Sequence, residues 1–164
     1  MDSGPVTPAA RSLRTLAMAL VSAPVVVLVA VVAALPTDWD RVPGLTLLGP
    51  VVAFVLVGLV AAETIGYRAE PLAADDPDPQ RTALARFQQL MMLRLVCTEV
   101  PIIVAVAVSF AFDEGAWPLL VAVVVGLPAL VLEVWPSRRA VRKVADALES
   151  TGTASGLPTA FGHA

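Results

Sequence analysis

Residues 45–65 read LTLLGPVVAFVLVGLVAAETI, an apolar run whose only charged residue is Glu63. About twenty helical residues, each rising ~1.5 Å, cross the ~30 Å hydrocarbon core of a bilayer. The many Val residues would suit a strand in water, but in lipid a single segment must satisfy its own backbone hydrogen bonds. This segment is therefore predicted to be a transmembrane helix.

Three further apolar runs of similar length lie at residues 16–35, 90–112 and 117–135. The whole chain of 164 residues is 57% hydrophobic and 15% charged, whereas an ordinary soluble domain is about a quarter charged. A soluble globular protein is thereby excluded, and the net charge of −3 argues against a nucleic-acid-binding protein. The predicted fold is all-α and integral to the membrane, with four transmembrane helices.

The two halves of the chain resemble each other, which favours two tandem helical hairpins. Superposing Pro24 on Pro101 aligns the Val-rich runs that follow them, and superposing Glu63 on Glu133 aligns the ends of the second and fourth spans. Apolar sequences align easily by chance, so four spans without a duplication remain the alternative.

Basic residues lie almost entirely on one side of the predicted spans. Arg41 alone lies in the connections on the other side, and the remaining ten of the 11 Lys and Arg residues flank the opposite ends of the spans. Because basic residues resist translocation, both termini and the loop at residues 67–86 are predicted to be cytoplasmic. The expected location is a bacterial-type cytoplasmic (inner) membrane, with the lipid bilayer as the first partner.

The regions outside the spans carry signals of their own. Asp78 and Pro79 predict a helix N-cap and first helical residue well before the third span. Residues 138–149 form a basic amphipathic segment that either lies on an anionic leaflet or continues the fourth helix into solvent. The expected boundaries are 1–12 for a flexible N-terminus, 13–149 for the membrane bundle and 150–164 for a disordered tail.

Three glutamates interrupt the spans, and each lies five residues from an arginine. The pairs are Glu63 with Arg68, Glu99 with Arg94, and Glu133 with Arg138. Five residues span ~7.5 Å of helix, so the three carboxylates are expected at one shallow depth on the cytoplasmic side. Residues five apart do not share a helix face, so each carboxylate is expected to meet a neighbouring helix's arginine more readily. For Glu63 and Glu133 the expected role is structural, by reaching the interface or pairing with Arg68, Arg94 or Arg138.

Glu99 has the most apolar surroundings, and two roles are open for it. Pro101 cannot donate to the carbonyl of Cys97, so that carbonyl, the Thr98 hydroxyl and the Glu99 carboxylate would line a proton or cation site. A charged residue within a span is costly and is functional by default. The competing explanation is a structural ion pair between Glu99 and Arg94, or an arginine of another span.

A small residue recurs at every fourth position of the second span, at Gly58, Ala62 and Gly66. Such a face lets another helix approach closely, either within the bundle, against Ala122 and Gly126 of the fourth span, or across a homodimer.

The sequence contains no evident nucleophile with its base, phosphate loop or metal-ligand cluster, so no enzyme, metal site or cofactor is predicted. The expected function is a non-enzymatic helical-bundle interaction or accessory module that packs with itself or with another membrane protein. The alternative is a small proton- or cation-coupled permease that uses its membrane-embedded glutamates.

The stretch FQQLMMLRLVCTEVP at residues 87–101 resembles the third-span pattern of small four-helix inner-membrane proteins of bacteria that have no assigned activity. That resemblance implies an inner-membrane location and no particular activity. The membrane carboxylate is also similar to that of the duplicated-hairpin proteolipid subunits of rotary ATPases. Those hairpins are glycine-rich, carry the carboxylate near mid-membrane and have outward-facing termini. The glycine-poor spans, a Glu99 nearer the inner leaflet and inward-facing termini argue against a rotor role here.

Overall fold

The computed structural model describes residues 6–112 and 114–162. Its long helices are α1 (Pro8–Ala34), α2 (Leu45–Ile65), α3 (Pro79–Ala111) and α4 (Trp117–Val134), followed by α5 (Arg138–Leu148) and the short α6 (Leu157–Ala160). Each of the four long helices is long and apolar enough to cross a membrane. The predicted all-α fold with four transmembrane helices is therefore confirmed.

Capping side chains set the start of α1 and of α3. Asp78 accepts a hydrogen bond from the backbone N–H of Arg81 (3.1 Å), and α3 begins at Pro79 as predicted. Thr7 accepts a hydrogen bond from the N–H of Ala10 (3.3 Å), so α1 begins at Pro8. The expectation of a flexible N-terminus over residues 1–12 is thus wrong for residues 8–12, while residues 1–5 lie outside the described part of the chain.

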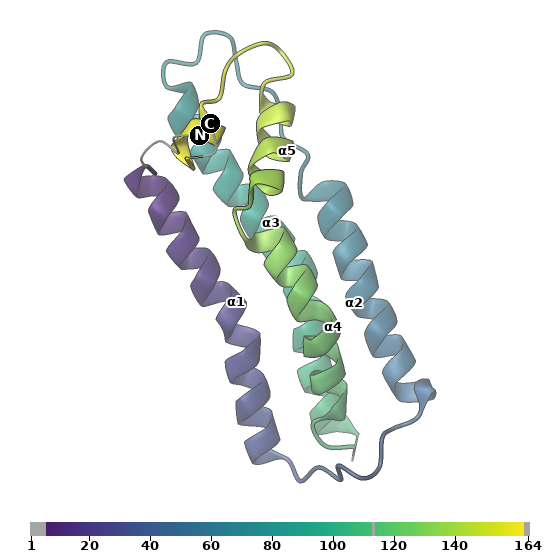
Figure 1. Cartoon of the computed structure of the whole chain (residues 1–164). Helices are drawn as coiled ribbons and strands as arrows, with labels where there is room; N and C mark the ends of the chain where they lie inside the picture. The colour runs from purple at the N-terminus through teal and green to yellow at the C-terminus, as the bar shows by residue number, and fades with distance from the viewer. Residues whose placement is uncertain (1–5, 113, 163–164) are drawn as a thin grey trace.

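The helices α3 and α4 form a central antiparallel pair, and α1 and α2 lie on opposite sides of it (Figure 1). α2 packs on both central helices, whereas α1 packs mainly on α4. Of the two predicted tandem hairpins, only the second is formed by direct packing. The connection at residues 35–44 runs along the end of the bundle and is long enough to carry the chain from one side of the central pair to the other.

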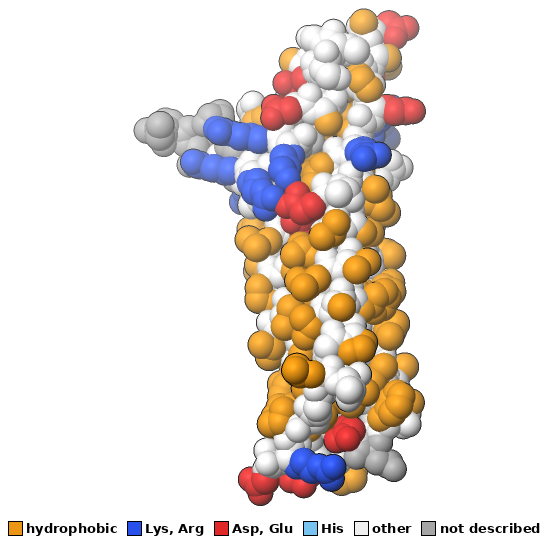
Figure 2. Space-filling view, turned by 90° about the vertical axis from the view of Figure 1, so that its right-hand side faces the viewer, with side chains coloured by type: hydrophobic (Ala, Val, Ile, Leu, Met, Phe, Trp, Pro, Cys, Tyr) orange, Lys and Arg blue, Asp and Glu red, His pale blue; other side chains and the backbone are white. Residues whose placement is uncertain are grey.

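The spans are apolar over most of their height on the face seen in Figure 2. Large side chains such as Val26 (66% exposed) and Leu132 (60% exposed) point outward, which suits a surface that contacts lipid. Between the helices, residues such as Val55, Ile102 and Leu119 form a buried cluster. A second cluster extends from the spans into the region beyond them.

We use the word cap for α5, α6 and the segment of residues 66–78, which together cover one end of the bundle (Figure 1). α4 ends at Val134, and α5 starts after Ser137, whose hydroxyl accepts a hydrogen bond from the N–H of Ala140 (3.2 Å). The apolar face of α5 is buried in the same cluster as Leu72 and Phe87. α5 is therefore a separate helix and not a continuation of the fourth helix into solvent, and its apolar face packs on protein and does not insert into a leaflet.

The described part of the tail, residues 150–162, packs back onto the bundle. Phe161 is fully buried, and its ring centroid lies 5.1 Å from that of Phe87. The backbone N–H of Thr7 donates to the carbonyl of Ala160 (3.0 Å), and Arg14 donates to the carbonyl of Phe161 (2.9 Å). The predicted disordered tail is corrected for these residues, because a few apolar side chains anchor a segment whose composition is otherwise polar and small.

Candidate functional site

Arg94, near the middle of α3, is fully buried where the bundle meets the cap. Its Nε donates to the carbonyl of Glu133 (2.7 Å), and its Nη1 donates to the carbonyl of Gly66 (2.8 Å). These carbonyls lie at the C-terminal ends of α4 and α2, where a helix leaves carbonyls without internal partners and its dipole favours a cation. Arg94 therefore joins three helices through charge-assisted hydrogen bonds.

The ring of Tyr67 lies between two cations. The guanidinium carbon of Arg94 is 4.3 Å from the ring centroid, and the ammonium nitrogen of Lys143 is 4.5 Å from it. Both distances suit cation–π attraction. Burial raises the pKa of the Tyr67 hydroxyl to about 12; the charge of Glu133 acts in the same direction, and that of Arg94 opposes it. The phenol is therefore neutral at physiological pH.

Glu63, at the end of α2, binds two basic residues of α5. Its Oε1 is bonded to Arg139, and its Oε2 accepts a hydrogen bond from Lys143 (2.5 Å). The hydrogen bond to Glu63, together with the negative charge of this carboxylate, raises the pKa of Arg139. The sequence correctly indicated that a carboxylate would meet a neighbouring helix, but it favoured Arg68, Arg94 or Arg138 as the partner. Arg139 and Lys143 share a face of α5 as an i, i+4 pair, but Arg138 and Arg142 have the same spacing, so the sequence does not distinguish the two pairs.

Glu133 of α4 is 1% exposed; its backbone carbonyl accepts the hydrogen bond from Arg94, and its buried Oε2 has no hydrogen-bond partner within the described residues. We refer to Glu63, Tyr67, Arg94, Glu133, Arg139 and Lys143 as the charge cluster. It contains three of the five residues predicted as a charged or ion-binding site, namely Glu63, Arg94 and Glu133. Its position at the junction of bundle and cap means that its interactions connect α2, α3, α4 and α5.

Glu99 and Thr98 are not part of this cluster. The Thr98 hydroxyl donates within its own helix, to the carbonyls of Arg94 (2.8 Å) and Leu95 (3.1 Å). Glu99 is half-buried, and within residues 6–112 and 114–162 it has no hydrogen bond or ion pair. The expected pair between Arg94 and Glu99 is not formed, since residues five apart point about 140° away from each other around a helix.

The small-residue face of α2 packs against α3. A Cβ added to Gly58 would lie 2.3 Å from the carbonyl oxygen of Cys97, and one added to Gly66 would lie 2.2 Å from the Cγ of Arg94. Ala62, between them, is fully buried. The predicted close approach is thus real, but the helix opposite is α3 and not α4, and the face is occupied within the chain. A Cβ added to Gly126 of α4 would lie 3.2 Å from the side chain of Ile102 on α3 and 3.5 Å from that of Val55 on α2.

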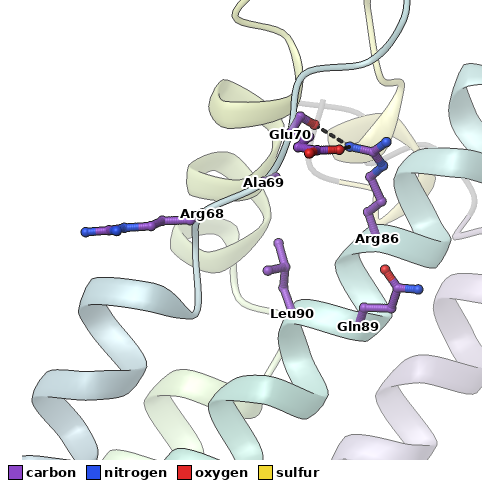
Figure 3. Close-up of a pocket in the computed structure, with 6 residues that line it drawn as sticks. All are labelled: Arg68, Ala69, Glu70, Arg86, Gln89 and Leu90. Carbon is purple, nitrogen blue, oxygen red and sulfur yellow. Dashed lines mark hydrogen bonds and ion pairs between the residues drawn. The ribbon is translucent and has the colours of Figure 1, made fainter.

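A shallow surface pocket lies between the cap segment that follows α2 and the first half of α3 (Figure 3). Arg86 donates to the carbonyl of Glu70 (2.6 Å), and its guanidinium lies 3.9 Å from the Glu70 carboxylate. Arg68 points away from this pair in Figure 3. The cation of this pocket, Arg86, is thus already bonded to Glu70, and the lining residues provide no set of free polar groups that point at one ligand.

Comparisons of the chain with protein-family models, with curated proteins and with solved structures give no match. The class of protein follows from the fold itself, which is that of a multi-pass membrane protein with four candidate spans. The charge cluster at one end of those spans is its most distinctive site.

Proposed function

We propose that this chain is a non-enzymatic interaction or accessory module of a bacterial-type cytoplasmic membrane, with its cap and both termini in the cytoplasm. The observation that carries the proposal is that charged side chains near the membrane boundary form bonds between helices. Arg94 is bonded to the ends of α2 and α4, and Glu63 is bonded to α5. Charges that hold helices together in this way stabilise a fixed architecture.

The orientation is supported by the distribution of basic residues, which lie at the cap end of the spans with the exception of Arg41. The structure brings the start of α1 and the end of the described tail to that same end.

Association with a second copy or with another membrane protein is proposed to use α1. The small-residue face of α2 is occupied by α3, so it is not available for a partner. In the apolar window of α1 17% of the residues are buried, against 28% in α2, 39% in α3 and 50% in α4. α1 therefore has the largest share of its span open to a neighbour in the membrane.

Site-directed crosslinking tests this proposal. In a Cys97→Ala background, Val29→Cys places a thiol on α1 and Val60→Cys places one on α2, at positions with similar exposure of 64% and 61%. We expect crosslinks to a second copy or to a partner protein from position 29 and few from position 60. An isolated monomer in native mass spectrometry from a mild membrane mimetic, with no crosslink from either position, would reject the proposal.

A small proton- or cation-coupled permease is the second candidate function, and one observation favours it. Glu99 is a half-buried carboxylate in a predicted span, and in the described part of the chain it has no bonded partner. A carboxylate in such a place is a candidate ion or proton site. This candidate requires flux across the membrane that Glu99→Gln abolishes.

A further inference from the structure

Basic side chains gather just beyond the apolar surface of the spans, on the face shown in Figure 2. The sequence has basic residues in the segment that follows α2 and in the first two turns of α5, and Arg139 and Lys143 of α5 bind Glu63 near the end of α2. Four of these basic residues are exposed and the fifth is half-buried. We call this set the basic band, and it consists of Arg68, Arg138, Arg139, Arg142 and Lys143.

The basic band has a net positive charge. Glu63 is the carboxylate that contacts it, through Arg139 and Lys143. Arg68, Arg138 and Arg142 have no ion pair within the described residues. Asp146, in the last turn of α5, and Glu149, its C-cap, lie at the end of the helix away from the spans, and Glu149 is hydrogen-bonded to Ser155. Three exposed arginines are therefore available to an external anion.

The band lies where the apolar surface ends. Ile65 (42% exposed) precedes Arg68 by three residues, and Leu132 (60% exposed) precedes Arg138 by six. Apolar side chains at this position contact acyl chains, so the cations directly beyond them are at the level of the lipid headgroups. α5 starts at this level and runs away from the spans (Figure 1), so the positive end of its dipole also faces the headgroups.

We propose that the basic band binds the phosphate groups of anionic phospholipids in the leaflet on the cap side. Guanidinium groups match phosphate oxygens in charge and in hydrogen-bond geometry. The apolar face of α5 is buried in the cap, so this binding is electrostatic and involves no insertion of α5 into the leaflet. It is therefore expected to weaken as ionic strength rises.

Lipid binding to the whole chain, measured by native mass spectrometry in detergent with added phosphatidylglycerol or phosphatidylcholine, tests this site. The test variant is Arg138→Gln/Arg142→Gln, which removes two exposed arginines of the band. The control variant is Arg41→Gln/Arg81→Gln, which removes two exposed arginines outside it. Each basic residue near a membrane surface contributes about a fivefold gain in affinity, so the test variant is expected to bind phosphatidylglycerol about 30-fold more weakly.

We expect the wild type and the control variant to prefer phosphatidylglycerol to phosphatidylcholine by similar factors, and the test variant to lose most of that preference. Thermal unfolding of the three proteins verifies that all are folded. Two results would overturn the proposal: a wild type without preference between the two lipids, or equal loss of preference in the two variants. Binding of an acidic protein by the band, with no lipid preference, would likewise reject a lipid site.

Discussion

Replacing Arg94 by Leu removes the side chain that joins the ends of α2 and α4 to α3. Two charge-assisted hydrogen bonds, of 2.7 and 2.8 Å, are lost, and the carbonyls of Glu133 and Gly66 are left without this donor. A hydrogen bond to a charged group contributes about 1.5–3 kcal/mol. Because Leu restores some apolar packing and needs no desolvation, we expect a net loss of about 3–5 kcal/mol in the free energy of unfolding.

Unfolding in bicelles by titration with a denaturing detergent measures this loss, and three further variants identify its origin. Arg94→Lys keeps the charge but not the planar fork of donors, so it should be intermediate. Arg94→Leu/Glu133→Leu should recover part of the loss, since it also removes a buried carboxyl group whose Oε2 has no hydrogen-bond partner in the described part of the chain. Arg94→Leu/Glu99→Leu should recover little, because Glu99 is not a partner of Arg94. Two results would refute this reasoning. One is a free energy of unfolding for Arg94→Leu within about 1 kcal/mol of the wild type, and the other is a loss that Arg94→Leu/Glu99→Leu recovers and Arg94→Leu/Glu133→Leu does not.

Three other predictions test separate parts of the structure. Gly58→Ala should destabilise the protein by about 1–3 kcal/mol, because the added Cβ would lie 2.3 Å from a backbone carbonyl oxygen of α3. Gly49→Ala is the control, since a Cβ added there would have nothing within 4 Å and should not destabilise the protein. Equal free energies of unfolding for the two variants would contradict the close packing of α2 on α3. The pKa of Tyr67 is raised from 10.0 to about 12, so its contribution to stability should be complete below pH 10 and be lost as the pH rises towards 12. If the free energy of unfolding of the wild type and that of Tyr67→Phe changed in the same way between pH 10 and 12, this prediction would be wrong. In intact cells, Asp75→Cys should be protected from an impermeant thiol reagent and Asp40→Cys should be labelled, and the reverse pattern would invert the proposed orientation.

The sequence was sufficient for the features that depend on local physics. Uninterrupted apolar length predicted the spans, and the limits of α2 agree with residues 45–65. Capping chemistry predicted the start of α3 at Pro79. The spacing of Glu63 from Arg68 correctly favoured a partner on another helix, because helix geometry separates residues five apart.

The features that the sequence did not provide depend on which helices become neighbours. Arg94 binds backbone carbonyls, which every residue has, so no residue pattern identifies those acceptors. The small-residue face of α2 predicted a close approach without naming α3 as the helix opposite. The burial of Phe161 against Phe87 joins two segments that are far apart in the chain, and tail composition contains no signal for such a contact.

The central claim is that the charges at the membrane boundary hold the helices together and do not move ions. Proton and cation flux into proteoliposomes under an imposed potential tests it most directly, with the wild type, Glu99→Gln, Glu70→Gln as an exposed-carboxylate control, and empty vesicles measured side by side. We predict equal rates in all four preparations. Flux in the wild type that clearly exceeds that of empty vesicles, is lost in Glu99→Gln and persists in Glu70→Gln would contradict the account and establish the permease.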